Sequence, residues 1–249
     1  MRTLISLVML CGMTACFAEA IEDDEAAVGT DEQDIIGGTT DTGDPSVVAI
    51  FAHQPGATSG SLCTGTVISA RAVLTAAHCV DPRVVGTGNV FEVLPGTTLS
   101  LSNSLAVSAT AFDSAFNPNN LGGGHDIAVV TLAQPTTLTP IPYNRGALGT
   151  GSVRIVGYGS NTHSNTGAGT KRQATTTIAS STSTLVTIGT SNKQTCHGDS
   201  GGPAFQTIGG QEVIIGVTSY GYDRTTTVCY NGGVDTRVNA YTGFVDSHL

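Results

Sequence analysis

The sequence predicts an all-β fold. Runs rich in Val, Ile and Thr recur along the chain, and glycine-rich breaks separate them, which is the pattern of many short strands joined by turns. Glycine, serine and threonine are abundant, whereas only 12% of the residues are charged and tryptophan is absent. At 249 residues the chain is long enough to bury one large core, and single all-β domains of this size are common.

The N-terminus has the pattern of a secretion signal. Arg2 supplies a positive charge, and residues 4–10 form an apolar core that is too short to span a membrane. The run Ala18-Glu19-Ala20 has the small residues of a cleavage site. Residues 1–20 are therefore interpreted as a signal peptide, and the mature protein is expected outside the cell or in the periplasm.

A lipoprotein signal is a second interpretation of the same stretch. The run Met13-Thr14-Ala15-Cys16 is similar to a bacterial lipobox. Residues 1–15 would then be the signal, and a lipid on Cys16 would anchor the protein to a membrane. Cleavage after Ala20 would instead remove two of the six cysteines and leave four for pairing.

Residues 21–34 form an acidic segment without apolar periodicity. Together with Glu19 they contain 8 of the 19 acidic residues, so the chain from Ile35 onward has 11 acidic and 9 basic residues. Such a segment cannot bury enough apolar surface to fold alone, which fits a propeptide or a solvated linker. Because the remaining chain has no excess of basic residues, nucleic acid is not an expected partner.

Strand patterns follow in order from Ile35 to the C-terminus. Proline-rich residues 135–142 indicate a crossing between two halves. Residues 238–249 place Val238, Tyr241 and Val245 on one face of a helix, which predicts a short terminal helix with a structural role. The expected strands are 45–51, 63–69, 71–75, several within 84–112, 127–132, 153–159, a long Thr/Ser-rich stretch over 175–188, and 213–221.

A serine in a glycine-rich turn is the candidate nucleophile. It lies in the run Cys196-His197-Gly198-Asp199-Ser200-Gly201-Gly202-Pro203. Gly198 has no Cβ, so the backbone can approach a ligand, and the N–H groups of Gly198 and Ser200 can point to one spot where an oxyanion forms. Serine is a weak nucleophile and needs a histidine base, which in turn needs an orienting carboxylate.

Two further motifs supply a candidate base and a candidate acid. His78 ends the run Leu74-Thr75-Ala76-Ala77-His78-Cys79, directly after an expected strand. Asp126 precedes the apolar run 127–132, where its carboxylate cannot be freely solvated and needs a hydrogen-bond donor. A structural histidine and a turn aspartate that caps a strand are the alternatives for these two residues.

These motifs, together with Ile35-Ile36-Gly37-Gly38, resemble those of the chymotrypsin/trypsin-like serine proteases. His78, Asp126 and Ser200 follow one another in the chain order of that family, which differs from the orders in subtilisin and in the α/β-hydrolases. The resemblance covers residues 35–249. It implies a protease domain of two packed six-stranded antiparallel β-barrels with a short C-terminal helix.

The resemblance gives each of these residues a role. Ser200 would attack the scissile carbonyl, His78 would take its proton and return it to the leaving amine, and Asp126 would hold the imidazole. The N–H groups of Gly198 and Ser200 would form the oxyanion hole. The expected disulfides, which a secreted protein can form, are Cys63–Cys79 and Cys196–Cys229.

Activation by cleavage is a further implication of the resemblance. A cut before Ile35 would free an α-ammonium that pairs with Asp199, and before the cut this carboxylate would be buried without a partner. An activating protease is therefore an expected partner. Asp34 precedes the cut where many relatives have Arg or Lys, which does not fit a trypsin-like activator.

The specificity pocket is where the sequence departs from trypsin. Gln194 stands six residues before Ser200, where trypsin-like relatives have Asp, so a cationic side chain at the substrate residue before the scissile bond (P1) would find no buried anion. A small or polar neutral P1 residue is the main interpretation. The alternative is an acidic P1 residue bound by Gln194, His197 and Arg224, the last on the insertion 222–228. The expected substrate-binding residues are Gln194, Thr195, Ser219, Tyr220, Gly221 and Gly233.

The sequence therefore predicts a secreted serine endopeptidase that acts on polypeptides as a monomer. No cofactor is expected, and no metal, because the six histidines show no pair at ligand spacing. Contact with a membrane is expected only if Cys16 is lipidated. The alternative function is a catalytically silent homologue that serves as a binding module.

Overall fold

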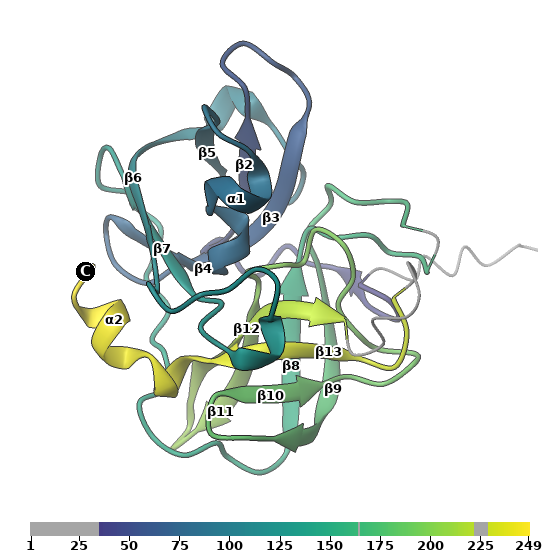
Figure 1. Ribbon diagram of the computed structural model, residues 1–249. Coiled ribbons are helices and arrows are strands. Elements are labelled where there is room, and N and C mark those ends of the chain that lie inside the picture. Colours follow the sequence, from purple (N-terminus) through teal and green to yellow (C-terminus); the bar gives the residue numbers. More distant parts are fainter. Residues whose placement is uncertain (1–34, 164, 222–228) are drawn as a thin grey trace, which may run out of the picture. The chain divides into compact units, whose positions relative to one another are not determined.

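The computed structural model describes residues 35–163, 165–221 and 229–249. Most of the regular structure is strand, and the strands form two closed six-stranded antiparallel barrels (Figure 1). This arrangement confirms the predicted all-β fold with two barrels. The predicted leader, residues 1–34, and the predicted insertion, residues 222–228, lie outside the described residues.

The first barrel closes in the strand order β2-β3-β4-β7-β6-β5. Its interior is filled by Val, Ile, Leu and Ala side chains, because alternate residues of each strand point inward. The strands are β2 Val47–His53, β3 Gly60–Val67, β4 Ala72–Thr75, β5 Val90–Leu94, β6 Leu105–Phe112 and β7 Ala128–Leu132.

The second barrel closes in the order β9-β10-β13-β12-β11-β8, since β8 also pairs with β9. A two-residue strand, β1 Thr39–Thr40, adds to the outer side of β9. The strands are β8 Ser152–Gly157, β9 Arg172–Ser181, β10 Leu185–Ile188, β11 Pro203–Ile208, β12 Gln211–Gly221 and β13 Gly233–Arg237.

Several strand boundaries differ from those predicted. The expected strand 45–51 begins instead at Val47, because the N–H of Val47 donates to Asp44 in a turn. The next strand runs over Gly60–Val67 rather than 63–69, since β2 and β3 pair as far as His53 and Gly60. The Thr/Ser-rich stretch 175–188 belongs to two strands, β9 and β10, that pair with each other.

The predicted terminal helix, residues 238–249, is shorter than expected. It consists of a 3-10 turn, η4 Val238–Ala240, and a helix, α2 Thr242–Asp246, separated by Tyr241 with a non-helical φ of −124°. Tyr241 leaves the helical path because its ring is buried and its hydroxyl accepts the N–H of His125. The predicted apolar face is confirmed, since Val238, Tyr241 and Val245 all pack in the core.

The other helical segments are single turns between strands. Asp81 caps α1, Pro82–Val85, by accepting the N–H of Arg83, and Pro82 occupies the first turn, where proline is tolerated. None of the helices among the described residues is long and apolar enough to cross a membrane. The remaining turns are η1 Ala77–Cys79, η2 Leu101–Asn103 and η3 Leu121–Gly123.

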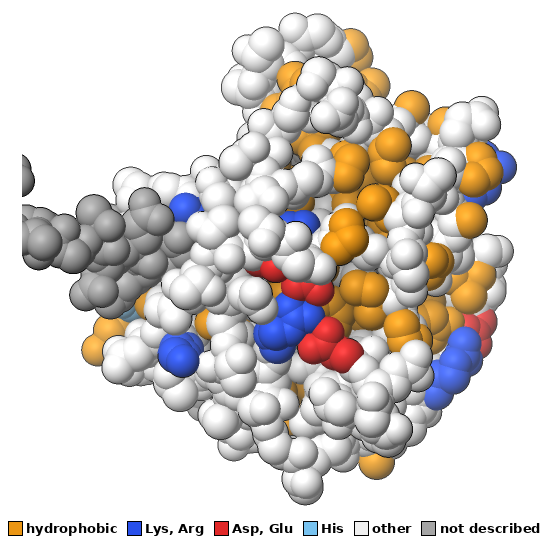
Figure 2. Space-filling model, turned by 180° about the vertical axis from the view of Figure 1, so that it is seen from behind, with side chains coloured by type: hydrophobic (Ala, Val, Ile, Leu, Met, Phe, Trp, Pro, Cys, Tyr) orange, Lys and Arg blue, Asp and Glu red, His pale blue; other side chains and the backbone are white. Residues whose placement is uncertain are grey.

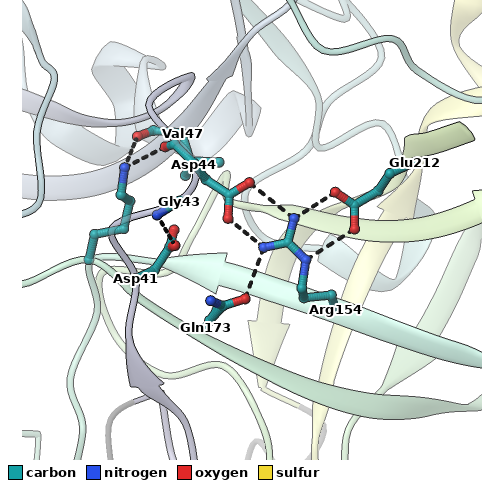
Figure 3. Close-up of polar contacts among 8 residues, drawn as sticks. Asp41, Gly43, Asp44, Val47, Arg154, Gln173 and Glu212 are labelled. Carbon is teal, nitrogen blue, oxygen red and sulfur yellow. Dashed lines mark hydrogen bonds and ion pairs between the residues drawn. The ribbon is translucent and has the colours of Figure 1, made fainter.

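An ion-pair network fastens the segment before β2 to the second barrel (Figure 3). The Arg154 guanidinium on β8 donates to both carboxylate oxygens of Asp44, to both of Glu212 and to the amide oxygen of Gln173. Burial alone raises the pKa of Asp44, but the hydrogen bonds and charge of Arg154 outweigh burial and hold that pKa below 3.8. Arg154 thus neutralises Asp44 where water is largely excluded.

Charged side chains are otherwise sparse on the face that Figure 2 shows, and lysines and arginines are scattered over it.

The same segment before β2 receives a second buried cation. The Nζ of Lys171 donates to the carbonyl oxygens of Asp44 and Val47, and burial lowers its pKa while the charges of Asp41 and Asp44 raise it. Two cations of the second barrel therefore hold one short segment of main chain.

Replacing Arg154 by Met is expected to lower the free energy of unfolding by about 2–3 kcal/mol at pH 7. The side chain of Asp44 is only 14% exposed and would be left as an unpaired carboxylate. Glu212→Gln is the control, because Glu212 is 40% exposed and its loss is expected to cost less than about 1 kcal/mol. Urea denaturation measures both, and equal losses would contradict this ranking.

Candidate active site

A cleft of about 400 Å³ brings together residues that lie far apart in the sequence. The candidate base His78 and the candidate nucleophile Ser200 both line it. The first barrel and its connections contribute one wall, and β12 together with the segment before β11 contributes the other. The lining residues are His78, Val84, Pro118, Leu121, Thr195, Cys196, His197, Ser200, Thr218, Ser219, Tyr220, Gly221 and Cys229.

His78 and Asp126 are in direct contact. His78 lies in the 3-10 turn η1 after β4, and Asp126 lies two residues before β7, which pairs with β4. The Nδ1 of His78 is 2.7 Å from Oδ2 of Asp126, and the main-chain N–H of His78 donates to Oδ1 at 2.9 Å. The carboxylate thus holds both the ring and the backbone of His78, which directs the Nε2 side of the ring away from Asp126.

A third donor reaches Asp126 from the other barrel. The hydroxyl of Ser219, on β12, donates to Oδ2 of Asp126. Asp126 has no exposed surface, while 18% of the His78 side chain is exposed. A buried carboxylate needs such donors because water cannot solvate it. The three hydrogen bonds therefore satisfy Asp126 and leave the imidazole accessible from the cleft.

The turn that carries Ser200 requires glycine at position 198. Gly198 has a φ of +97°, and a Cβ there would lie 2.9 Å from the Cα of Gly159. Thr64 on β3 holds the turn through two hydrogen bonds. Its hydroxyl donates to the carbonyl of Gly198, and its N–H donates to the carbonyl of Ser200. Within the described chain, the N–H groups of Gly198 and Ser200 donate to no acceptor. They are thus available to a ligand.

Asp199 is fully buried beside this turn. Its carboxylate accepts the N–H of Cys196 and that of Gly159, each at 2.8 Å. The pKa of Asp199 is raised to about 7, because burial outweighs the lowering effect of these two hydrogen bonds and of the charge of Arg172. The carboxylate is therefore held in place but not fully neutralised.

Ile35, the predicted first residue after activation, is also buried. Its side chain belongs to the apolar core of the second barrel. The next residue, Ile36, accepts the N–H of Gln194 at 3.2 Å, five residues before Asp199. Residues 35 and 36 therefore pack against the second barrel, and Ile36 contacts the loop that leads to Ser200.

Both expected disulfides are present. Cys63–Cys79 joins β3 to the turn that carries His78, and Cys196–Cys229 joins the Ser200 loop to the segment before β13. The side chains of Cys63, His78 and Cys79 lie within 4.8 Å of one another. This cluster does not suit a metal, because metal ligation requires thiolates and both sulfurs are oxidised.

Four of the six predicted substrate-binding residues line the cleft: Thr195, Ser219, Tyr220 and Gly221. Gln194, expected as the pocket floor, does not line it, and neither does Gly233. A Cβ at Gly233 would lie 2.6 Å from Oγ1 of Thr195, so glycine at this position makes room for Thr195.

The protein itself binds the amide of Gln194, the predicted floor of the specificity pocket, and the role of this residue as a substrate contact stays a prediction. Nε2 donates to the carbonyl oxygens of Ser191 and Cys229, and Oε1 accepts the N–H of Gly232 at 2.7 Å. The residue has no exposed surface. With both amide hydrogens and the oxygen engaged, Gln194 is a structural cross-link of the loops beneath the cleft.

The sequence did not reveal the cleft wall formed by Val84, Pro118 and Leu121. These residues lie in α1 and in the connection before β7. The sequence there has no strand or helix periodicity that predicts which way a side chain points. The sequence analysis also missed Thr218. The alternation of side-chain directions along β12 is the signal that would have placed it in the cleft. Arg224, expected at the mouth, lies outside the described residues.

Comparison with known proteins identifies the family. A family model described as Trypsin matches residues 35–245. The chain belongs to this family of serine proteases. It is 28% identical to trypsin, alkaline C, of Manduca sexta, over 90% of this chain and 94% of that protein. It is 30% identical to chymotrypsin-like elastase family member 1 of Bos taurus (86% and 89%) and 32% identical to the Macaca fascicularis protein of the same name (75% and 78%).

Membership of the trypsin family agrees with the resemblance inferred from the motifs and with the two barrels. The family match begins at Ile35, the residue at which the described structure begins. The relatives are named for both trypsin and elastase, so the family does not by itself choose a P1 residue.

The enclosed position of Gln194 can be tested by Gln194→Glu. The variant keeps the shape but replaces both donors with an acceptor, so that a carboxylate faces the carbonyls of Ser191 and Cys229. We expect the free energy of unfolding at pH 8 to fall by about 2–4 kcal/mol, measured by urea denaturation. Asn192→Asp, on the exposed part of the same loop, is expected to change it by less than about 0.5 kcal/mol. A Gln194→Glu variant as stable as this control would show that the amide is not enclosed.

Proposed function

We propose that the protein is a serine endopeptidase in which Ser200, His78 and Asp126 act as the catalytic triad. The observation that carries the proposal is the 2.7 Å contact between His78 Nδ1 and Asp126, in a cleft that Ser200 also lines. This contact fixes the tautomer with the proton on Nδ1, so that Nε2 is free to accept a proton.

The reaction proceeds by acyl transfer. Ser200 Oγ attacks the scissile carbonyl while His78 Nε2 takes its proton, and the carbonyl oxygen becomes an oxyanion. The N–H groups of Gly198 and Ser200 stabilise that oxyanion, each contributing about 3–4 kcal/mol. His78 then gives the proton to the leaving amine, and water hydrolyses the acyl-enzyme by the reverse sequence of transfers. Asp126 stabilises the imidazolium in both halves.

The inferred precursor is a zymogen with residues 1–20 as a signal peptide and 21–34 as a propeptide, exported to the extracellular space or the periplasm. A lipid anchor on Cys16 is the alternative for the precursor. Cleavage before Ile35 would release an α-ammonium, and Asp199 is the anion that suits it, since burial raises the pKa of Asp199 to about 7. Neutralising that carboxylate would favour the conformation of the neighbouring Gly198–Ser200 turn.

Ser200→Ala is expected to abolish peptide hydrolysis and labelling by a fluorophosphonate in the protein cleaved before Ile35. The change removes one oxygen at a partly exposed position, so the melting temperature is expected to stay within about 2 °C of the parent. Thr207→Ala, on the exposed part of β11, is the control and should label fully. A parent protein that is folded and cleaved but does not label would favour a silent homologue.

Asp199→Asn tests the activation step in the uncleaved protein. Because the folded pKa of Asp199 is raised from 3.8 to about 7, the folded state binds the proton more tightly, and stability falls as the pH rises between these values. The variant removes this fall and is expected to be more stable at pH 8 by about 1–3 kcal/mol, although its amide meets the N–H of Cys196 less well than a carboxylate does.

After cleavage before Ile35 we expect the parent to be more stable than the Asp199→Asn variant. The new α-ammonium stabilises the parent and not the Asp199→Asn variant, and only the parent gains peptidase activity. Urea denaturation at pH 5 and pH 8, before and after cleavage, measures both effects. An equal response of parent and variant to cleavage would contradict pairing of Asp199 with the new terminus.

A further inference from the structure

A histidine beside the candidate acid has no role in the chemistry described so far. His125 directly precedes Asp126, in the connection between the paired strands β6 and β7. Its φ is +67°, in the left-handed region that residues with a Cβ rarely adopt. Such a conformation costs free energy and persists only where neighbouring contacts enforce it. Contacts with Tyr241 and Asp113 hold His125 in this conformation.

Tyr241 contacts both the backbone and the ring of His125. Its hydroxyl accepts the main-chain N–H of His125 at 2.8 Å. The two rings meet edge to face, with centroids 5.2 Å apart and planes at 70°. A Cβ at Gly124 would lie 2.8 Å from the tyrosine hydroxyl, so glycine at this position lets Tyr241 approach. Because Tyr241 is itself packed in the core, it supports His125 from a fixed position.

Asp113 contacts the ring of His125 from the end of β6. The Nδ1 of His125 is 3.1 Å from Oδ1 of Asp113, and because a carboxylate only accepts hydrogen bonds, Nδ1 carries the proton. Oδ1 also accepts the N–H of Ala115 at 2.9 Å. The main-chain N–H of Asp113 donates to the carbonyl of Ile127 at 3.1 Å. The carboxylate that holds the ring is therefore fixed to both ends of the connection.

The main chain of His125 in turn sets the position of Asp126. The carbonyl of His125 accepts the N–H of Ile127 at 2.9 Å, which closes a three-residue turn around Asp126. From this turn the carboxylate of Asp126 reaches His78, with Oδ2 2.7 Å from Nδ1. If His125 left the left-handed conformation, the turn would move and the carboxylate would move with it.

We propose that His125 is a positioning residue for the catalytic triad. Asp113 and Tyr241 hold it in its left-handed conformation, and this conformation fixes Asp126 against His78. The proposal rests on the endopeptidase function above. His125 does not line the cleft, so it acts on the reaction only through Asp126. The titratable groups in contact with its side chain are Asp113 and Tyr241, and Asp126 is its neighbour in the chain.

The same connection also supplies Pro118 and Leu121 to the cleft wall. Both lie between Asp113 and His125 in the chain, so the contact of these two residues closes the base of that wall. A contact that only shapes the wall would change substrate binding and hence KM. A contact that positions Asp126 changes kcat, because Asp126 acts on the base and not on the substrate.

His125→Gly and His125→Asn form a matched pair, measured in the protein cleaved before Ile35 with a peptide substrate that the parent hydrolyses. Both residues tolerate a left-handed φ, but only Asn keeps a donor on Cγ, where histidine has Nδ1. We expect His125→Gly to lower kcat about tenfold with KM within about twofold, and His125→Asn to keep kcat within about threefold. An unchanged kcat in His125→Gly, or equal losses in both variants, would overturn the proposal.

His248→Gly is the control for loss of a histidine. The Nδ1 of His248 also contacts a carbonyl, that of Phe244 at 2.8 Å, but the residue does not line the cleft or contact Asp126. We expect this variant to keep the kcat and KM of the parent. A tenfold loss in the control as well would overturn a specific role of His125.

The pH dependence of kcat/KM gives a readout that a merely structural role would not move. The base His78 acts in its neutral form, and a well-placed carboxylate favours its charged form. A displaced Asp126 therefore shifts the acid midpoint of activity to lower pH. We expect a shift of about 0.5–1 pH unit in His125→Gly and none in His125→Asn. A lower melting temperature or a raised KM with an unmoved midpoint would overturn the proposal.

Asp113→Ala carries the same test if His125→Gly does not fold. It removes the acceptor of His125 Nδ1, whereas Asp113→Asn keeps an oxygen in that place. We expect Asp113→Ala to lower kcat and the acid midpoint in the same direction as His125→Gly, and Asp113→Asn to keep both. Because the two residues act through one contact, the effects of Asp113→Ala and His125→Gly on kcat should not add in the double variant. Full additivity would overturn the proposal.

NMR separates this proposal from the proposed function. A proton in a short bond between Nδ1 and a carboxylate resonates far downfield, and the resonance of His78 is assigned by its absence in His78→Gln. Its loss in His125→Gly and its retention in His125→Asn would support positioning even if no peptide were cleaved, in which case the endopeptidase function alone would fail. A parent that cleaves peptides, with a His78 resonance unchanged in both variants, would retain the function and overturn the role of His125.

Discussion

The geometry of the cleft depends on the carboxylate of Asp126. It accepts the main-chain N–H and the ring Nδ1 of His78 from the first barrel and the hydroxyl of Ser219 from the second. Because Asp126 has no contact with solvent, these donors take the place of water, and the loss of any one would leave a buried charge undersatisfied. The contact that orients the candidate base therefore also joins the barrels where the cleft opens.

The buried carboxylates of this protein divide by how their charge is offset. Asp44 is neutralised in place by Arg154, and this pair holds a segment of chain to the barrel. Asp199 and Asp235 have raised pKa values because the described residues offset their charge only in part. Asp199 precedes Ser200 in the sequence, and Asp235 is the cross-strand partner of Thr218. Ser200 and Thr218 both line the cleft. On the function proposed here, the charge of Asp199 is completed by a cation that arrives later, the new N-terminus.

Much of the fold and part of the site were accessible from the sequence, for local reasons. Alternation of apolar residues marked most strands, and the short motifs around His78 and Ser200 carried the family resemblance. The terminal helix was predicted too long, since the buried Tyr241 interrupts it to meet the N–H of His125. The role of Gln194 as a substrate contact stays a prediction, because position in a motif does not show whether an amide faces a cleft or the backbone that encloses it.

The sequence by itself determined the class of fold, the family and the order of the motifs, because these follow from residue types and spacings along the chain. Only the tertiary structure decided what faces the cleft. It enclosed Gln194 among backbone groups and placed Asp235 behind Thr218 without a cation among the described residues. Burial and cross-strand pairing are properties of residues that meet in space, and two barrels folded around one cleft bring together groups that no local pattern connects.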